Sequence, residues 1–329
     1  MIKVGISSCL LGNPVRYDGG HRNNRFCKES LSQFFQFVSL CPEVGIGLPT
    51  PRKTIRLVGD VDSPRAVLSD GGDEDFTTEL RQFAESHKKT LESLSGYILC
   101  KASPSCGMER VKVYNDSGQA EKKGMGIFAA RLQTLLPHLP LEEDGRLNDP
   151  LIRDSFIKRV FIYNEWKSLQ DSGRDDSEIG SESGKNGQGL TTRKLHEFHA
   201  RHKFTLLAHN QPIYRKVGPL LASVNKQNID AISEEYITLL MLGLKKVATR
   251  KNNTNVLMHL QGYLKDKLSA EDKAELTQCI HDYRDGLQPI LGVLTLLKHH
   301  FRKFPEPYID NQSFLAPYPK DLAIRVDTH

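Results

Sequence analysis

The sequence predicts a three-layer α/β domain with a mostly parallel sheet, followed by an all-α helical domain. Short apolar strands alternate with helical patterns over residues 1–140, which is typical of a parallel sheet covered by helices. From Thr191 to about Lys303, apolar residues recur at helical spacing with no β-rich run between them. Residues 171–189 are rich in Asp, Ser and Gly, as flexible linkers are. We therefore expect an α/β domain over 1–140, a helix and linker over 141–189, and a helical domain over 190–329.

The individual elements follow from local patterns. Alternating or continuous apolar residues predict strands at 2–6, 35–38, 97–100 and 111–114. Helical spacing in the first half predicts helices over 75–93, 124–136 and 149–169. The same spacing predicts helices in the second half over 206–224, 232–247, 255–268 and 287–297.

Composition and charge limit the function classes. The chain of 329 residues is 38% hydrophobic and 26% charged, as ordinary globular proteins are. It lacks a run of about 20 apolar residues and a signal-peptide pattern, so we expect a cytoplasmic protein without a membrane partner. Of the net charge of +5, residues 190–329 carry +6, from 20 Lys and Arg against 14 Asp and Glu. A polyanion is therefore a plausible partner of the second half.

Three of the six cysteines follow predicted strands. Cys9, Cys41 and Cys106 come after the strands at 2–6, 35–38 and 97–100. If these strands are parallel neighbours, the three thiols converge at one sheet edge, where open α/β sheets bind ligands. Three thiolates would leave one position open on a zinc ion, or one free iron on a cubane cluster. Three buried free cysteines are the alternative.

The other cysteines are expected to matter less. Cys100 lies inside the strand at 97–100, so we expect it to point into the core. It is the next candidate for a metal ligand after the other three. Cys27 and Cys279 fall in helical patterns and have no expected role.

Four motifs in the first half resemble the DUF523 family, which includes the thiouracil desulfidases. They are Ser8-Cys9-Leu10-Leu11-Gly12, Val15-Arg16-Tyr17-Asp18-Gly19, Cys41-Pro42-Glu43-Val44 with Gly47-Leu48-Pro49-Thr50-Pro51-Arg52, and Ser103-Pro104-Ser105-Cys106-Gly107. The resemblance covers about residues 1–140. It implies a [4Fe-4S] cluster held by Cys9, Cys41 and Cys106, with a fourth iron that binds the sulfur removed from the substrate.

Motifs of the second half are similar to the DUF1722 domain. They include Leu195-His196-Glu197-Phe198-His199, Asn255-Val256-Leu257-Met258-His259 and Pro317-Tyr318-Pro319. Proteins that fuse the two domains resemble desulfidases acting on 4-thiouridine in transfer RNA (tRNA). One departure concerns Lys53-Thr54-Ile55-Arg56, where stand-alone relatives usually carry an acidic residue; it favours an anionic substrate over a free base.

The chemistry of C=S hydrolysis suggests roles for neighbouring residues. A soft sulfur is best captured by a thiophilic Lewis acid such as an iron with an open position. Glu43, two residues after Cys41, is placed to be a general base or proton relay. Ser103 and Ser105 could position the ring or give up protons, although both could simply cap a turn.

Substrate-binding residues are expected at the mouth of the site and in the helical domain. Arg16, Tyr17 and Arg52 would line the mouth, with Tyr17 able to stack on a base or to serve as a core residue. Gly124 and Gly126 precede a helix and could offer amides to phosphate, or merely form a turn. The helical domain contains a cluster of cations that we expect to contact phosphates or, alternatively, to form a solvated face: Lys245, Lys246, Arg250 and Lys251.

Four histidines are expected in the core or facing RNA, with a metal site as the less favoured alternative because no carboxylate lies at matching spacing: His196, His199, His202 and His209. We conclude that the sequence favours a [4Fe-4S] desulfidase that converts 4-thiouridine in tRNA to uridine and sulfide. A desulfidase of free thiopyrimidines such as 2-thiouracil is the near alternative. A non-enzymatic, zinc-stabilised nucleic-acid-binding protein is the distant one.

Overall fold

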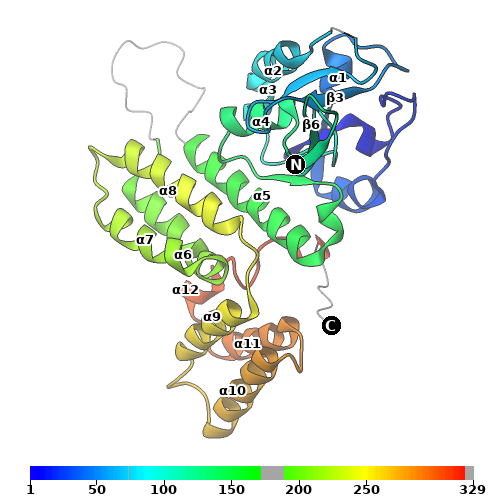
Figure 1. Ribbon diagram of the computed structural model, residues 1–329. Coiled ribbons are helices and arrows are strands. Elements are labelled where there is room, and N and C mark those ends of the chain that lie inside the picture. Colours follow the sequence, from blue (N-terminus) through cyan, green and yellow to red (C-terminus); the bar gives the residue numbers. More distant parts are fainter. Residues whose placement is uncertain (73, 172–188, 323–329) are drawn as a thin grey trace. The chain divides into compact units, whose positions relative to one another are not determined.

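The computed structural model describes residues 1–72, 74–171 and 189–322, which divide into two units, residues 1–156 and 157–329 (Figure 1). The N-terminal unit contains two four-stranded sheets in its described part. The first has the order β2 (Phe35–Leu40), β1 (Ile2–Ser7), β5 (Tyr97–Leu99), β8 (Leu141–Glu143). The second has the order β4 (Arg65–Leu68), β3 (Ile55–Val58), β6 (Val111–Tyr114), β7 (Ala120–Gly124).

The first sheet is entirely parallel, which confirms the arrangement on which the cysteine argument depends. β1 pairs with β2 on one side and with β5 on the other, both in parallel. The carboxyl ends of these three strands therefore meet at one edge. The predicted fold class is confirmed, with the sheet continuing to residue 143.

The second sheet was not expected from the sequence as a separate layer. β3 pairs in parallel with β6, whereas β4 and β7 add antiparallel strands at its edges. β7 escaped prediction because four of its five residues are exposed and three of them are charged, as in a hairpin edge strand protected by charge.

Helices cover and connect these sheets. The described helices of the unit are α1 (Pro42–Gly45), α2 (Thr77–Ser86), α3 (Lys88–Glu92), α4 (Ile127–Leu135) and the start of α5 (Pro150–Asp171). Short helical turns lie at η1 (Ser8–Leu11), η2 (Phe26–Ser30), η3 (Leu31–Gln33) and η4 (Arg146–Asn148). On α4, Ile127 packs with the second sheet and Phe128 packs on Tyr97 of the first, so this helix joins the two cores.

The C-terminal unit is helical, as predicted. Its elements are the rest of α5, α6 (Thr192–His209), α7 (Gln211–Ala222), α8 (Ile229–Leu244), α9 (Arg250–Gly262), α10 (Ala270–Asp285), α11 (Ile290–Lys303), α12 (Pro307–Asp310) and η5 (Lys320–Leu322). α6 contributes to two cores, one with α5, α7 and α8, the other with α9, α10 and α11. The predicted helix 206–224 is two helices, because Asn210 caps a new one that has Pro212 in its first turn.

The linker predicted at residues 171–189 lies almost entirely outside the described residues. Among those that are described, no helix combines the length and apolar character needed to cross a bilayer.

Candidate functional site

The three predicted cysteines line one pocket at the carboxyl edge of the first sheet. The pocket has a volume of about 230 Å³. Cys9 comes from η1, Cys41 precedes α1, and Cys106 lies in the loop after β5. The lining also includes every other residue that the sequence predicted for the N-terminal site: Arg16, Tyr17, Glu43, Arg52, Ser103 and Ser105.

The loop that carries Cys106 is held rigidly by the start of α4. The Ile127 amide donates to the Pro104 carbonyl (3.0 Å), and the Ala129 amide donates to the Ser105 carbonyl (3.2 Å). The Gly126 amide donates to Gly107 (2.7 Å), and a Cβ on Gly126 would lie 2.6 Å from the Ser105 backbone. The helix start, for which the sequence left phosphate binding and simple turn geometry open, therefore fixes the cysteine loop through its amides.

A fourth thiol lies in the same pocket. Cys100 follows β5 directly and is 6% exposed, and it lines the pocket rather than pointing only into the core, as the sequence suggested. Its side chain hydrogen-bonds to Cys9. Its amide donates to the Ser7 hydroxyl (3.0 Å), which in turn hydrogen-bonds Cys106. Ser7 is a functional residue that the sequence analysis missed.

Of the three predicted ligands, Cys106 is buried, whereas Cys9 and Cys41 are partly buried. Burial raises the pKa of Cys41 and of Cys106 above the ordinary thiol value. The hydrogen bond to Cys100, together with burial, raises the pKa of Cys9. Since metal ligation requires thiolates, a cationic metal centre is what would stabilise the ionised form of these groups.

The donor set fits a cluster. Tyr97 of β5 is fully buried and interacts electrostatically with Cys106, Cys41 and Cys9, yet its hydroxyl has no hydrogen-bond partner among the described residues. Such a donor is suited to the sulfurs of an iron–sulfur centre. Nowhere in the described ranges do three His, Cys, Asp or Glu side chains approach closely enough to hold a single ion, and a cluster needs wider spacing.

A directed hydrogen-bond chain runs beside Cys106. The Ser103 hydroxyl accepts from the amides of Ser105 (3.3 Å) and Cys106 (3.0 Å), so its own proton is free for Ser105. Ser105 donates to Glu43 Oε1 (2.6 Å). Arg52 donates through Nε (3.0 Å) and Nη2 (2.6 Å) to Glu43 Oε2. The chain Ser103–Ser105–Glu43 can therefore carry a proton to or from the pocket.

Arg52 has a different role from the one predicted. Its side chain is only 5% exposed and is committed to Glu43, rather than free at the mouth. Its amide donates to the Tyr17 carbonyl (2.8 Å), which ties the Tyr17 loop to the site. Arg52 therefore compensates the charge of the carboxylate and orients it.

The mouth of the pocket is basic. Tyr17 is exposed and lies under the Arg16 guanidinium, 5.4 Å from the ring centroid, so it is not a core residue. Arg22 and Lys101, which the sequence analysis did not select, also line the pocket. Of the segment that departs from stand-alone relatives, Thr54 and Ile55 line the pocket, whereas Lys53 pairs with Asp70 (2.8 Å).

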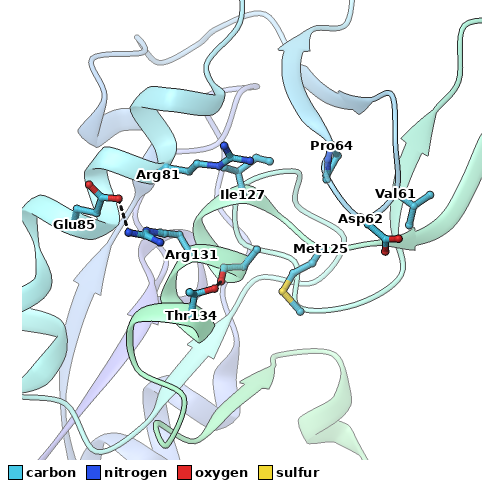
Figure 2. Close-up of a pocket in the computed structure, with 10 residues that line it drawn as sticks. Val61, Asp62, Pro64, Arg81, Glu85, Met125, Ile127, Arg131 and Thr134 are labelled. Carbon is cyan, nitrogen blue, oxygen red and sulfur yellow. Dashed lines mark hydrogen bonds and ion pairs between the residues drawn. The ribbon is translucent and has the colours of Figure 1, made fainter.

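A second, larger pocket of about 400 Å³ lies in the same unit (Figure 2). It is formed by α2, α4 and the β3–β4 connection, and an Arg131–Glu85 ion pair (2.7 Å) crosses it. Its described lining contains no thiol, so the cysteine pocket is the candidate site.

The cations predicted in the helical unit lie at the junction of α8 and α9. Lys245 and Lys246 follow α8, and Arg250 begins α9; all three are exposed. The Lys246 carbonyl interacts with His209, and Arg250 lies 5.9 Å from the Tyr283 ring centroid. None of the three takes part in an ion pair within the described residues.

The histidines are mostly core groups. His202 and His209 are buried, His199 is partly buried, and His196 is exposed. His202 lies 3.3 Å from Glu165 of α5 and bonds Ser313 of the C-terminal segment (2.9 Å). The sequence missed this carboxylate because it comes from another helix.

Comparisons with known proteins agree with the two-part organisation. The family model of 2-thiouracil desulfurase matches residues 4–144, and that of DUF1722, a protein of unknown function, matches residues 203–319. The uncharacterized protein YbgA of Escherichia coli K12 is 31% identical over 173 residues, which are 52% of this chain and 93% of YbgA. The solved structure of the [4Fe-4S]-dependent thiouracil desulfidase TudS is 29% identical, with a TM-score of 0.36, and the match covers 45% of this chain and 94% of that one.

Proposed function

We propose that this chain, which belongs to the 2-thiouracil desulfurase family and continues into a DUF1722 domain, is a desulfidase that converts 4-thiouridine in tRNA to uridine. One water is consumed and one hydrogen sulfide is released, so there is no net redox change. The observation that carries the proposal is the convergence of Cys9, Cys41 and Cys106 in one pocket, beside a hydrogen-bonded Glu43.

The proposed cofactor is a [4Fe-4S] cluster held by Cys9, Cys41 and Cys106. When bound, it supplies a thiophilic Lewis acid that polarises the C=S bond and accepts the departing sulfur. The buried Tyr97 hydroxyl would donate to the sulfurs of this centre.

The residues of the chain handle the proton. Glu43 takes a proton from the attacking water, either directly or through Ser105, because Oε1 accepts from the Ser105 hydroxyl. In the return step Glu43 gives the proton back to Ser105, whose own hydroxyl proton passes to the departing sulfide, while Ser103 holds Ser105 in place because its oxygen is fixed by two amides. Arg52 keeps the carboxylate in place throughout.

The pocket suits a single pyrimidine ring. The pocket of about 230 Å³ must hold both the proposed cluster and the reacting base, and it is already below the roughly 300 Å³ at which sites for drug-sized ligands begin. Exposed Tyr17 offers a surface on which the base can stack, and Arg16 and Lys101 favour an anionic substrate at the mouth. A base within tRNA must be exposed or flipped to enter such a pocket.

The helical unit would bind the RNA backbone. Lys245, Lys246 and Arg250 are exposed and without an acidic partner in the described chain. A triple reversal of these charges to Glu should weaken action on tRNA, and each lost phosphate contact should lower the salt slope by about 0.7–0.9. A matched control reverses Arg193, Lys265 and Arg284, whose charges are already compensated by Glu197, Asp266 and Asp285.

The experiment uses the full chain, purified without oxygen, on tRNA containing 4-thiouridine and on free 2-thiouracil. Nucleoside analysis should show uridine formed from tRNA, a reduced kcat/KM for the triple variant on tRNA alone, and no change in the control. Rapid turnover of 2-thiouracil with no action on tRNA would instead identify a desulfidase of free thiopyrimidines, the alternative that the family description favours.

A further inference from the structure

The cysteine pocket holds one thiol more than the proposed cluster requires. Cys100 lines the pocket with Cys9, Cys41 and Cys106 and is 6% exposed. It hydrogen-bonds Cys9 and interacts electrostatically with Cys106. A fourth thiol that lines the same pocket and hydrogen-bonds Cys9 is placed to reach a cofactor bound by the other three.

The position of Cys100 is fixed from both sides. The Ser7 hydroxyl accepts from its amide (3.0 Å). Arg22 Nη1 lies 4.0 Å from the Cys100 sulfur and 3.4 Å from the Lys101 carbonyl. Asp144 orients this arginine from 3.3 Å and also accepts from the Lys101 amide (2.8 Å). These contacts fix a guanidinium next to the sulfur, and the field of the Asp144 carboxylate on Cys100 opposes that of Arg22.

We propose that Cys100 is an exchangeable ligand: its thiolate fills the fourth position of the cluster while no substrate is bound, and gives way to the sulfur of the substrate. The inference rests on the proposed function and deepens its account of the same site. When the iron–sulfur bond to Cys100 forms, the thiol releases its proton to solvent and no electron is transferred. When that bond breaks, the thiolate is left beside the Arg22 guanidinium.

Exchange of Cys100 as a ligand would account for the position of Arg22 beside its sulfur. A permanent ligand would need no cation near it, because the metal itself compensates the thiolate. A ligand that leaves becomes a buried anion, which is costly unless a positive charge is close. Arg22 brings a positive charge to 4.0 Å from the sulfur, and Asp144 orients this guanidinium while offsetting part of its field at Cys100.

The test compares wild type with Cys100→Ala and Cys100→Ser, all purified without oxygen, with Cys279→Ser as the control. We expect a full iron content in every protein. The reduced wild type should differ from both Cys100 variants in its electron paramagnetic resonance spectrum without substrate, and should approach them when 2-thiouracil is added. Iron loss to a chelator should be at least about tenfold faster in the Cys100 variants.

Identical substrate-free spectra and equal rates of iron loss in wild type and both variants would overturn the inference. It would also be overturned if the Cys100 variants lost the cluster and Cys9→Ala kept it, because Cys100 would then be a fixed ligand. Absence of an iron–sulfur centre from the wild type refutes the proposed function instead, so the two failures are distinguishable.

Discussion

The cysteine pocket of the N-terminal unit and the cationic end of α8 in the C-terminal unit were both predicted from sequence. The two regions differ in how far their predicted residues bond one another. In the pocket, residues from four separate motifs converge and bond one another, as Ser105, Glu43 and Arg52 do. At the α8–α9 junction, Lys245 and Lys246 remain solvated side chains. Side chains at the ends of neighbouring parallel strands must meet, whereas a run of cations on a helix acquires a role only from what binds it.

The first prediction tests the three proposed cluster ligands of the cysteine pocket. Cys9→Ala, Cys41→Ala and Cys106→Ala should each abolish iron binding and desulfidation, because each removes one of three proposed ligands. Cys279→Ser in α10 should change neither. Iron analysis and the absorbance of anaerobically purified protein measure the effect, and a fully loaded Cys41→Ala protein would contradict the ligand assignment.

The second prediction concerns the proton chain. Glu43→Gln should lower kcat by about 10²–10⁴-fold with iron content unchanged, because the amide cannot accept the proton of the attacking water. Ser105→Ala should have a smaller effect, since Glu43 keeps its Arg52 partner. The control is Glu121→Gln on the exposed β7, where Glu121 pairs only with Lys123. Equal kcat values for wild type and Glu43→Gln would show that another group acts as the general base.

The sequence allowed the parallel sheet to be predicted from strand–helix alternation, and the convergence of Cys9, Cys41 and Cys106 on the condition that their strands are neighbours, which the strand order of the structure supplies. It could not reveal the second sheet, since the polar β7 shows no apolar alternation. It also could not place Cys100, because a residue at the last position of a strand can face either the core or the ligand edge.

The remaining misses are contacts between distant segments. Ser7 joins Cys100 to Cys106, and Tyr97 interacts electrostatically with the cysteines, but neither belongs to a motif with a spacing that signals function. Glu165 meets His202 across two helices whose packing no local pattern reveals. Such partners are set by tertiary packing, which local sequence patterns do not specify.

The third prediction compares one glycine from each unit. Gly126→Ala should destabilise the N-terminal unit by about 1–3 kcal/mol, because the new Cβ meets the Ser105 backbone at 2.6 Å although its φ of −64° suits any residue. Gly218→Ala in α7 meets nothing within 4 Å and should stabilise by about 0.5–1 kcal/mol. Thermal unfolding followed by circular dichroism measures both, and a neutral Gly126→Ala would show that the cysteine loop can move.

The smallest effect is expected in the helical core, where His199 packs near Tyr236. Burial, with the positive fields of Lys203, His196 and His202, lowers the pKa of His199 to about 4. The folded state therefore favours the neutral ring, while the unfolded chain binds a proton below its ordinary pKa of 6.5. The unfolded state holds more protons between these values, so stability is complete above pH 6.5 and falls as the pH is lowered.

Linkage gives a loss of about 1 kcal/mol between pH 7 and pH 5.5 from this group alone. His199→Gln should remove that part of the pH dependence, because the amide does not titrate. The single tryptophan, Trp166, reports on this core, since it is 2% exposed and packs against Phe198 and Tyr236 at 5.3 and 5.8 Å. Urea unfolding followed by its fluorescence at both pH values measures the contribution of His199 to the pH dependence of stability, as the difference between wild type and variant. Parallel pH curves for the two proteins would show that His199 is protonated equally in the folded and unfolded states, and that this helical core tolerates a charge as a solvated surface does.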